Sequence, residues 1–397
     1  MPQSTVARIL ALAPNHWHDQ WMNRQYLLSR LGRRHRVLYS RGPWKIWDRH
    51  GEEYRNSPMF GHFEPADNVL VDRPGRAALR VPTVPSLDRI TTTVAVRRWQ
   101  RQLDRMGAGP RVLWIFHPRF GYLADRLRFE RLVYHAYDLY SHTSDWTPQA
   151  AEAQRRLLAR ADLIVCSSDR IALELREVSG KPVHVVPNGV DFERFAAARS
   201  AAGPDELAAI PRPRIGYIGS LNQKVDFALL DALSARRPDW HFVLAGRTVG
   251  LGDAETVRFD SLVRRPNVHF LGQKSTAEIA GYTAGLDVGL LCYRTSGAWT
   301  EGIYPLKLHE YLACGLPVVS SDFPAVRDFP QVVWTARDPD DWHRRIEQAL
   351  AGGGPGAAAE RIAIARANSW DQRAALLDEL LLAMLEGPAS RAQARAS

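Results

Sequence analysis

Residues 301–319 carry the residue types that could bind a nucleotide, and they read EGIYPLKLHEYLACGLPVV. The proline and the last glycine predict a loop, a helix over 305–313 that begins with the proline, and then a buried strand. A helix N-terminus presents free N–H groups and a partial positive charge, which suits a phosphate, and Lys307 in the first turn adds a full charge. Glu310, three residues later on the same face, could accept hydrogen bonds from vicinal ribose hydroxyls. An ordinary helix with a surface Lys–Glu pair is the alternative.

A glycine loop, GSLNQK, follows the predicted strand Arg214–Ile218. Open α/β sheets bind ligands at the carboxyl ends of their strands, and Gly219 at that place lets the backbone approach a ligand closely. A tight turn with a solvated lysine is the alternative.

Asp138 follows the buried run Leu132–Tyr137. A carboxylate at the end of a strand could deprotonate a hydroxyl, and His135 is a rival for that role. Strand alternation places Asp138 and His135 on opposite faces, so they cannot share one task unless the strand has already ended. A turn cap for Asp138 and a core position for His135 are the alternatives.

Short apolar runs alternate with amphipathic stretches along the first half of the chain. The runs are nearly continuous, as in parallel strands that are buried on both faces, and the alternation predicts a doubly wound sheet. Strands are expected at Arg8–Ala13, Arg36–Ser40, Val112–Phe116, Leu132–Tyr137, Leu163–Ser167 and Val183–Val186, and helices at Asp19–Leu31, Val94–Arg105, Pro148–Ala159 and Ser168–Val178. Residues 41–90 are expected to form an elaborated loop region.

A Pro/Gly-rich stretch at 197–213 predicts a linker, after which the alternation restarts. Strands are expected at Arg214–Ile218, His241–Ala245, Val268–Leu271, Val288–Leu291, Pro317–Ser320 and Val332–Trp334, and helices at Val225–Ala235, Thr276–Ala284, Pro305–Ala313, Asp340–Ala351 and Trp370–Leu385. We therefore expect an α/β protein with two Rossmann-like doubly wound domains, 1–198 and 199–369, and a last helix with a flexible tail over 370–397.

The composition excludes several classes of protein. Of the 397 residues, 45% are hydrophobic and 24% are charged, which is typical of a globular protein with a full core. The three cysteines form no C-x-x-C pair, which disfavours a disulfide scaffold or a structural zinc site and favours a reducing cytoplasm. No apolar run reaches the ~18 residues of a spanning helix, and the first is too short for a signal-peptide core. Neither a dinucleotide-binding fingerprint nor a P-loop is present.

The net charge of +9 comes from the first half of the chain. Residues 1–198 hold 30 Lys and Arg against 20 Asp and Glu, whereas residues 199–397 hold 22 against 23. A one-sided basic domain indicates an anionic partner such as anionic lipid, a phosphorylated substrate or nucleic acid. No nucleic-acid-binding module is recognisable, so we expect no nucleic acid. Arg41, Trp44, Lys45 and Trp47 form a basic-aromatic cluster that suits a membrane interface or covers a core.

The pattern P-x-K-x-x-E-Y-L-A-x-G-x-P-V-V at 305–319 resembles the donor-binding motif of GT-B-fold glycosyltransferases. The resemblance is to bacterial cell-surface polysaccharide enzymes of the teichuronic-acid and xanthan-assembly kind. Further segments are similar to parts of that family: VPNGVD at 186–191 with Phe195, IGYIGSL at 215–221, VYHAYD at 133–138, and the last helix with Trp370. The resemblance implies two Rossmann-like domains facing across a cleft, with the C-terminal helix returning to the first domain.

The resemblance also implies site residues. A UDP- or GDP-sugar donor would bind the second domain through Gly219, Ser220, Lys224, Glu301, Tyr304, Lys307, Leu308 and Glu310. The acceptor would lie near the loop after the first strand, at His16, Trp17, Trp21 and Arg24. For that loop, a capped helix with inward-packed tryptophans is the alternative. Asp138 matches the base of the xanthan glucuronosyltransferase, and His135 remains its rival.

One position departs from the family pattern. Many members carry two glutamates with seven residues between them; Glu310 matches the second, but the first place is Gly302, and Glu301 is one residue off. Inverting and retaining chemistry therefore stay open. In a retaining enzyme the departing diphosphate would take the acceptor's proton, and Asp138 would orient a substrate. A nucleotide-sugar epimerase of the same fold and a catalytically inactive partner protein that binds a glycan or nucleotide are the alternative functions.

We expect a metal-independent glycosyltransferase (hexosyltransferase type) without a cofactor. Its acceptor would be a glycan, such as one linked to polyprenyl diphosphate. The enzyme would be cytoplasmic and peripheral at the inner face of the plasma membrane, where anionic lipid attracts each near-surface cation by about 1 kcal/mol. The acidic run at 338–341 is expected to cap a helix rather than to bind a metal.

Overall fold

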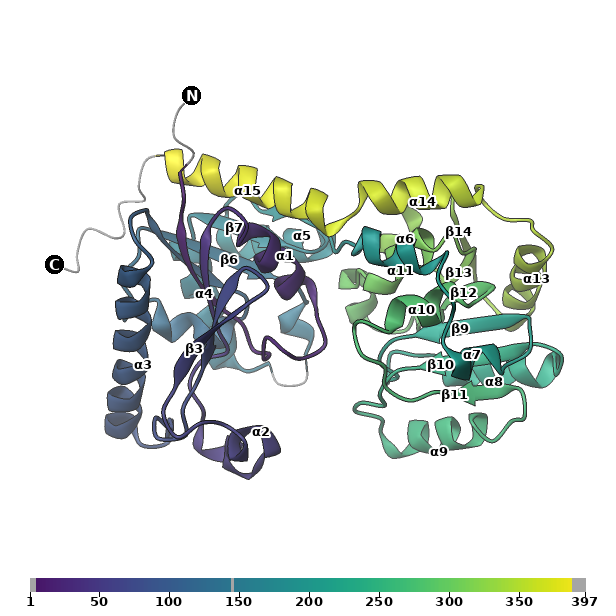
Figure 1. Ribbon diagram of the computed structural model, residues 1–397, viewed down its shortest axis with the longest axis horizontal. Coiled ribbons are helices and arrows are strands. Elements are labelled where there is room, and N and C mark those ends of the chain that lie inside the picture. Colours follow the sequence, from purple (N-terminus) through teal and green to yellow (C-terminus); the bar gives the residue numbers. More distant parts are fainter. Residues whose placement is uncertain (1–4, 144–145, 388–397) are drawn as a thin grey trace. The chain divides into compact units, whose positions relative to one another are not determined.

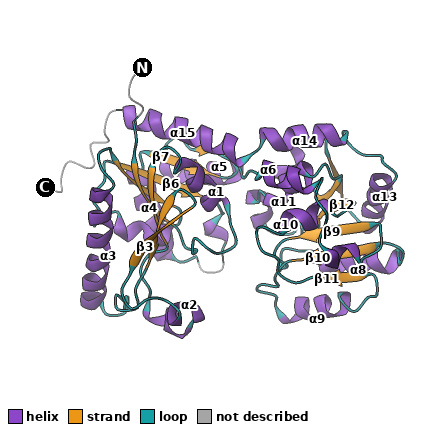
Figure 2. Ribbon diagram, viewed as in Figure 1, coloured by secondary structure: helices purple, strands orange, loops and turns teal. Residues whose placement is uncertain are grey.

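The computed structural model describes residues 5–143 and 146–387. In it, mainly parallel strands form two separate sheets. Contacts within the chain define two units, the first holding the residues up to Pro187 and those from Arg373 onward, the second holding Asn188–Gln372. Figure 1 labels the elements of each unit, and Figure 2 shows helices packed around the strands of each unit. The tail expected after the last helix, from residue 388, lies outside the described residues.

The first unit has an eight-stranded sheet in the order β3-β4-β2-β1-β5-β6-β7-β8. The strands are β1 (Arg8–Leu12), β2 (Arg36–Ser40), β3 (His62–Ala66), β4 (Val69–Arg73), β5 (Arg111–Ile115), β6 (Arg131–Ala136), β7 (Leu163–Cys166) and β8 (His184–Val185). The helices are α1 (Asn23–Leu31), α2 (Glu52–Arg55), α3 (Pro85–Arg105), α4 (Pro148–Arg160) and α5 (Asp169–Ser179), with 3-10 turns η1 (Ile46–His50), η2 (Pro118–Leu123) and η3 (Tyr140–His142). Every pairing is parallel except β3 with β4.

The second unit has a six-stranded sheet in the order β11-β10-β9-β12-β13-β14, with parallel pairings throughout. The strands are β9 (Arg214–Ile218), β10 (His241–Ala245), β11 (Val268–Phe270), β12 (Val288–Leu291), β13 (Val318–Ser321) and β14 (Val333–Ala336). The helices are α6 (Phe192–Ala198), α7 (Asp205–Ala208), α8 (Phe227–Arg236), α9 (Asp253–Leu262), α10 (Ile279–Ala284), α11 (Leu306–Ala313), α12 (Pro324–Arg327), α13 (Pro339–Leu350) and α14 (Ala358–Ala367), with the 3-10 turn η4 (Ala298–Gly302).

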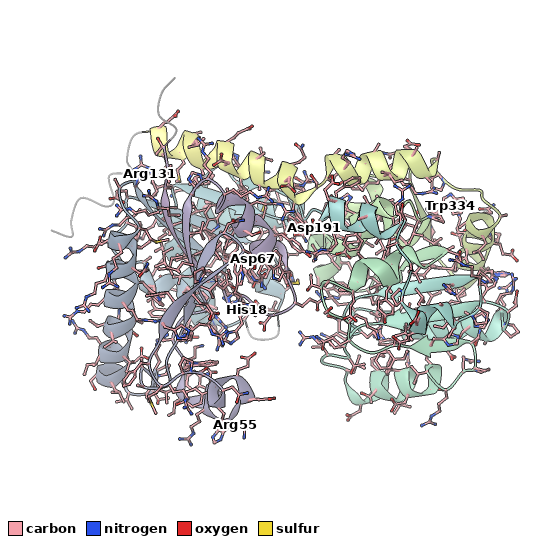
Figure 3. All side chains as sticks on the ribbon, viewed as in Figure 1. His18, Arg55, Asp67, Arg131, Asp191 and Trp334 are labelled. Atoms are coloured by element: carbon pink, nitrogen blue, oxygen red, sulfur yellow. The ribbon has the colours of Figure 1, made fainter. Side chains whose placement is uncertain are left out.

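The last helix, α15 (Trp370–Glu386), returns to the first unit, as expected. Its Asp378 contacts Arg34 and accepts a hydrogen bond from His35 at 2.6 Å. Arg131, which is labelled in Figure 3, donates hydrogen bonds to the carbonyl oxygens of Met384 and Gly387 near the helix end. The predicted two-domain α/β fold is therefore confirmed.

The units change at Pro187, earlier than the residue 198 expected from composition. The cause is α6, which lies inside the expected first domain but packs against α10 and α11 of the second unit.

Residues 41–90 were expected to form a loop region, but they add strands β3 and β4 to the sheet. Their hairpin turns at Asp67 and Asn68, whose φ angles are +47° and +67°, as a type I′ turn requires. The indole N–H of Trp17 donates a hydrogen bond at 3.0 Å to Asp67, which is labelled in Figure 3, and fixes the turn. The prediction failed because Asp-Asn is a weaker hairpin signal than Asn-Gly.

Two expected helix starts were also wrong. Helix α1 begins at Asn23 rather than Asp19, because the Asp19 carboxylate accepts the backbone N–H of His16 at 2.9 Å and closes a loop. Helix α3 begins at Pro85 rather than Val94. Its first turns were not predicted because their apolar side chains are exposed and therefore form no buried face that periodicity could reveal. The helices that were not expected are α2, α6, α7, α9, α12 and α14.

We predict that Asp72→Ala destabilises the first unit by about 3 kcal/mol. The buried Asp72 carboxylate accepts hydrogen bonds from Ser40 at 2.7 Å and from the Trp99 indole at 2.6 Å, and it pairs with Arg98. Its removal leaves those donors without a partner. Urea unfolding measures the loss. Asp125→Ala, which breaks an exposed ion pair with Arg160, should cost less than about 1 kcal/mol; equal losses would contradict the prediction.

Candidate functional site

Helix α11 is fixed against the second sheet by Tyr311. The Tyr311 hydroxyl accepts a hydrogen bond from the backbone N–H of Ile218, the last residue of β9, at 3.0 Å. The ring passes over Gly289, where an added Cβ would lie 2.6 Å from it. The helix begins at Leu306 rather than Pro305, which is extended (φ −75°, ψ 135°) and serves as the N-cap. Lys307 therefore occupies the second helical position at the carboxyl end of β9.

Two tyrosine hydroxyls hold the Lys307 ammonium. Its Nζ lies 2.9 Å from the hydroxyl of Tyr293 and 3.0 Å from that of Tyr217, and 4.2 Å from the centre of the Tyr217 ring. No ion pair of Lys307 occurs within the described residues. Phenol groups and a ring face stabilise a cation without cancelling its charge. The lysine is thus held in place with its charge available to an anion.

The ammonium lies where ligands bind in open α/β sheets. Strand β10 lies on one side of β9 and β12 on the other. Successive strands are added outward from β9 to β11 on one side and then from β12 to β14 on the other, so the strand order reverses between β9 and β12. Tyr217 belongs to β9, and Tyr293 follows the end of β12. The crevice outside the carboxyl ends of strands at such a reversal is the usual ligand site.

Gly219 makes the position of Lys307 possible. Its φ is +139°, and an added Cβ would lie 2.8 Å from Cε and 2.9 Å from Nζ of Lys307. Its backbone N–H donates to Ala245 at 2.7 Å. Ser220 follows, and its carbonyl accepts a hydrogen bond from the Tyr217 hydroxyl at 3.2 Å. The structure therefore brings the two segments singled out in the sequence, the glycine loop and helix α11, to one place.

Glu310 is a partly buried carboxylate. Burial raises its pKa from 4.5 to about 7, and the charges of Lys307 and Arg194 oppose that shift. Arg194 is itself paired with Asp191, labelled in Figure 3, at 3.0 Å. Within the described residues no hydrogen bond to the Glu310 carboxylate is recorded. Two unsatisfied oxygens one helical turn from a cation can accept hydroxyl donors.

The other predicted donor residues differ in their settings. Lys224 Nζ lies 5.0 Å from the centre of the Trp299 ring, and Glu301 is exposed on η4. The Tyr304 hydroxyl lies 2.9 Å from Nε2 of the buried His309. Leu308 is fully buried in the core of the second unit, so its side chain contributes packing there.

Asp138 lies in a turn two residues after the end of β6 and is partly buried. Its Oδ1 accepts the backbone N–H of Leu139 at 3.0 Å, which caps the turn. His135 is fully buried and stacks on Phe116 with ring centres 5.0 Å apart. Neither ring nitrogen of His135 has a hydrogen-bond partner within the described residues, and burial, followed by the charge of Arg24, lowers its pKa to about 3.

The loop after β1 contains the predicted acceptor residues. Trp17 is buried and packs edge-on against Tyr39 and the half-buried Trp21. His16 Nε2 lies 2.8 Å from a carboxylate oxygen of Glu53. Burial lowers the pKa of His16 to about 4, so its ring is neutral at neutral pH and this contact is not an ion pair. Arg24 is buried, with its guanidinium carbon 4.5 Å from the centre of the Tyr137 ring. Trp17 thus packs inward, whereas His16 and Arg24 bring polar groups to the carboxyl end of β1.

Two functional candidates, Tyr217 and Tyr293, were not identified from the sequence. Each lies at the carboxyl end of a buried strand beside a site loop, which is the signal that could have found them. The predicted acidic cap is confirmed: the Asp338 side chain accepts the backbone N–H of Asp341 at 2.8 Å. Within the described residues, no group of three or more His, Cys, Asp or Glu side chains could hold a metal ion.

Two family models match this chain. Residues 28–194 match Glycosyltransferase Family 4, and residues 212–352 match Glycosyl transferases group 1. Together they cover most of the two units, and the chain carries the glycosyltransferase domains that the sequence motifs indicated.

Similar proteins agree with that assignment. The chain is 31% identical over 225 residues to TuaH of Bacillus subtilis, named as a teichuronic acid biosynthesis glycosyltransferase; the match covers 54% of this chain and 56% of TuaH. The chain thus matches about half the length of this curated relative. Two solved structures share the fold: sucrose-phosphate synthase from Thermosynechococcus elongatus (17% identity, TM-score 0.68) and Anabaena Alr3699/HepE in complex with UDP and glucose (16% identity, TM-score 0.65). Each match covers 95% of this chain and 99% of the other.

We predict that the stability of the protein falls as pH rises from about 4.5 to about 7, through Glu310. The folded protein holds this proton over that range while the unfolded chain releases it, so a rise in pH favours unfolding. Glu310→Gln should remove this component, on the order of 1–3 kcal/mol, and should be the more stable protein at pH 8. Urea unfolding at pH 5 and pH 8 measures the difference. The exposed Glu301→Gln is the control; a pH response of Glu310→Gln equal to that of the control would contradict the prediction.

Proposed function

We propose that the protein transfers a sugar from a nucleoside-diphosphate sugar, with UDP or GDP as the nucleotide, to a glycan acceptor in cell-surface polysaccharide synthesis. The observation that carries this proposal is the Lys307 ammonium, held by two tyrosines beside Gly219, with the unsatisfied carboxylate of Glu310 one turn away. The cation and the helix N-terminus bind the diphosphate, and the carboxylate accepts the ribose hydroxyls. The UDP and glucose in the HepE complex and the naming of TuaH support these substrate classes.

The transfer breaks the bond between the anomeric carbon and the diphosphate oxygen and forms a bond from that carbon to an acceptor hydroxyl oxygen. Lys307 stabilises the negative charge that develops on the departing diphosphate. Fixed hydrogen-bond donors and cations stabilise the transition state of many transfer reactions in this way. Because a fixed protein cation carries this charge, the reaction is independent of a metal. Holding donor and acceptor together supplies the remaining rate enhancement.

Asp138 accepts the proton of the acceptor hydroxyl in an inverting reaction. Its Oδ1 is engaged with Leu139, and no hydrogen bond to its Oδ2 is recorded within the described residues. His135 packs in the core instead, since its ring is fully buried and its nitrogens have no hydrogen-bond partner among the residues that the structure describes. In a retaining reaction the departing diphosphate takes the proton, and Asp138 orients the acceptor.

The acceptor is a lipid-linked glycan, and the first unit meets the inner face of the plasma membrane from the cytoplasm. Within the described residues no helix is long and apolar enough to cross a bilayer. The first half of the chain carries the positive charge, and it exposes large apolar side chains between residues 47 and 94: Trp47, Met59, Phe60, Val84, Leu87, Ile90 and Val94. Basic charge with exposed apolar groups suits binding to an anionic interface.

Lys307→Met is expected to weaken the binding of UDP or GDP about tenfold or more, because it removes a charge-assisted contact to the diphosphate. Isothermal titration calorimetry measures the affinity. Lys274→Met is the matched control, since Lys274 pairs with Glu206 at 2.5 Å elsewhere in the same unit. Equal affinities for the Lys307 variant and the wild type would refute the donor site.

Asp138→Asn is expected to lower the turnover rate about 10²–10⁴-fold if Asp138 is the general base. His135→Leu, which keeps a buried side chain of similar size, should retain most of the rate. The assay follows release of the nucleoside diphosphate in the presence of acceptor. A smaller loss in a correctly folded Asp138→Asn protein would exclude Asp138 as the base.

The double variant Ile90→Ser, Val94→Ser is expected to reduce sedimentation with phosphatidylglycerol vesicles, because it removes apolar side chains from one face of α3. Val257→Ser, at an exposed position of the second unit, should bind as the wild type does. Unchanged sedimentation of the double variant would count against membrane docking through this face.

A further inference from the structure

A basic cavity of about 250 Å³ lies in the first unit, apart from the donor site. Four cations line it, Arg41, Lys45, Arg80 and Arg119, against one acidic lining residue, Asp48. At roughly 30 Å³ per water molecule, the cavity has room for a small oxyanion with its hydration. Neither the donor site nor the proposed base uses these side chains.

Three of the four cations make no ion pair in the part of the chain that the structure describes. Arg80 is neutralised by Asp88, whose carboxylate accepts two of its hydrogen bonds at 2.7 and 2.8 Å. Within the described residues no ion pair involves Arg41, Lys45 or Arg119. These three therefore form an unpaired positive group in the cavity wall.

The contacts of the unpaired cations leave donors free. Arg41 stacks 4.0 Å from the centre of the Trp44 ring, and its buried Nε and Nη1 have no hydrogen-bond partner within the described residues. Arg119 donates one Nη2 hydrogen bond to the carbonyl of Pro14 at 3.1 Å. A buried donor without a partner costs about 1–3 kcal/mol, so an anion that accepts from Nε and Nη1 of Arg41 would relieve an existing penalty, while the exposed Arg119 is open to the same anion.

The positive charges of these three side chains also repel one another. Burial lowers the pKa of Arg41, Lys45 and Arg119; Arg41 lowers that of Arg119 further, and Arg119 lowers that of Lys45. Asp48 acts in the opposite direction on all three. A bound anion would add the countercharge that this group lacks.

The cavity lies where the topology of the first sheet favours a ligand. Strand β1 has β2 on one side and β5 on the other, so the chain reverses its direction of growth there. Arg41 follows the end of β2, and Arg119 lies in η2 just after β5. The same edge carries Asp138: Tyr140, two residues after it, donates to the carbonyl of Phe116 at 2.7 Å, just past β5. An anion in this cavity therefore lies on the sheet edge that holds the proposed base.

We propose that Arg41, Lys45 and Arg119 bind a phosphate or diphosphate group carried by the acceptor. The identity of the ligand as an acceptor rests on the proposed function, whereas the binding of an oxyanion rests on this cavity alone. An anionic bilayer headgroup carries the same oxyanion chemistry and is the competing source. Because a diphosphate can engage more of the three cations than a phosphate can, the cavity should prefer it.

Calorimetric titration of the full chain with inorganic pyrophosphate and with inorganic phosphate tests the proposal. UDP or GDP, whichever binds, is held at saturation so that the donor site is filled. Lys45→Gln and Arg119→Gln should each weaken pyrophosphate binding about tenfold, and pyrophosphate should bind more tightly than phosphate. Arg128→Gln removes an exposed charge before the amino end of β6 and is the matched control; it should bind as the wild type does. Lys45, whose ammonium makes no recorded hydrogen bond, keeps the test valid if Arg119→Gln does not fold.

Two results would overturn the proposal. One is an unchanged pyrophosphate affinity in a folded Lys45→Gln or Arg119→Gln protein. The other is a loss of sedimentation with phosphatidylglycerol vesicles, relative to Arg128→Gln, without a loss of pyrophosphate affinity, which would assign these cations to the bilayer. Failure of the wild type to bind UDP or GDP would count against the proposed function, but it would leave the pyrophosphate result standing.

Discussion

The donor site of the second unit depends on one interaction, a lysine ammonium that two phenol groups hold and that makes no ion pair with any carboxylate of residues 5–143 and 146–387. Lys307 would be a far weaker anion ligand if an acidic side chain paired with it, since the ligand would then compete with that partner. Tyr217 and Tyr293 fix the ammonium through hydrogen bonds and ring contact while its charge persists. Glu310, the nearby carboxylate, opposes this charge only partly because burial raises its own pKa to about 7.

The rest of the second unit serves to place that ammonium. Tyr311 ties α11 to the last residue of β9, and Gly219 leaves room for the lysine at the strand end. Both units follow the same rule, by which charged groups gather outside the carboxyl ends of parallel strands where the strand order reverses. In the second unit the gathered groups suit a donor, and in the first they suit an anionic acceptor beside Asp138.

The sequence predicted much of the fold because its parallel strands are buried on both faces and read as continuous apolar runs. The strands Arg36–Ser40, Arg214–Ile218 and His241–Ala245 were predicted with the bounds that the structure has. The hairpin of β3 and β4 was missed because β3 is polar and partly exposed, and the apolar run of β4, at Val69–Val71, is short. The start of α3 was missed because periodicity reports a buried face, and Leu87 and Ile90 are exposed.

The candidate site was predictable where one local segment carries the signal, as at Lys307 and Glu310. The tyrosines that hold Lys307 could not be assigned to it from one local pattern. Tyr217 lies in β9, 90 residues away in the chain, and Tyr293 follows the end of β12, 14 residues away. The settings of Leu308 and Trp17, whose side chains are buried, depend on tertiary packing that no local pattern records. The roles of the predicted site residues stay predictions until ligands are bound.

A crystal structure of the protein with UDP or GDP tests the central claim most directly. The account predicts that Lys307 Nζ lies within about 3.2 Å of a diphosphate oxygen and that the Glu310 carboxylate accepts hydrogen bonds from the ribose hydroxyls. A nucleotide bound elsewhere, with Lys307 still in contact only with Tyr217 and Tyr293, would contradict it.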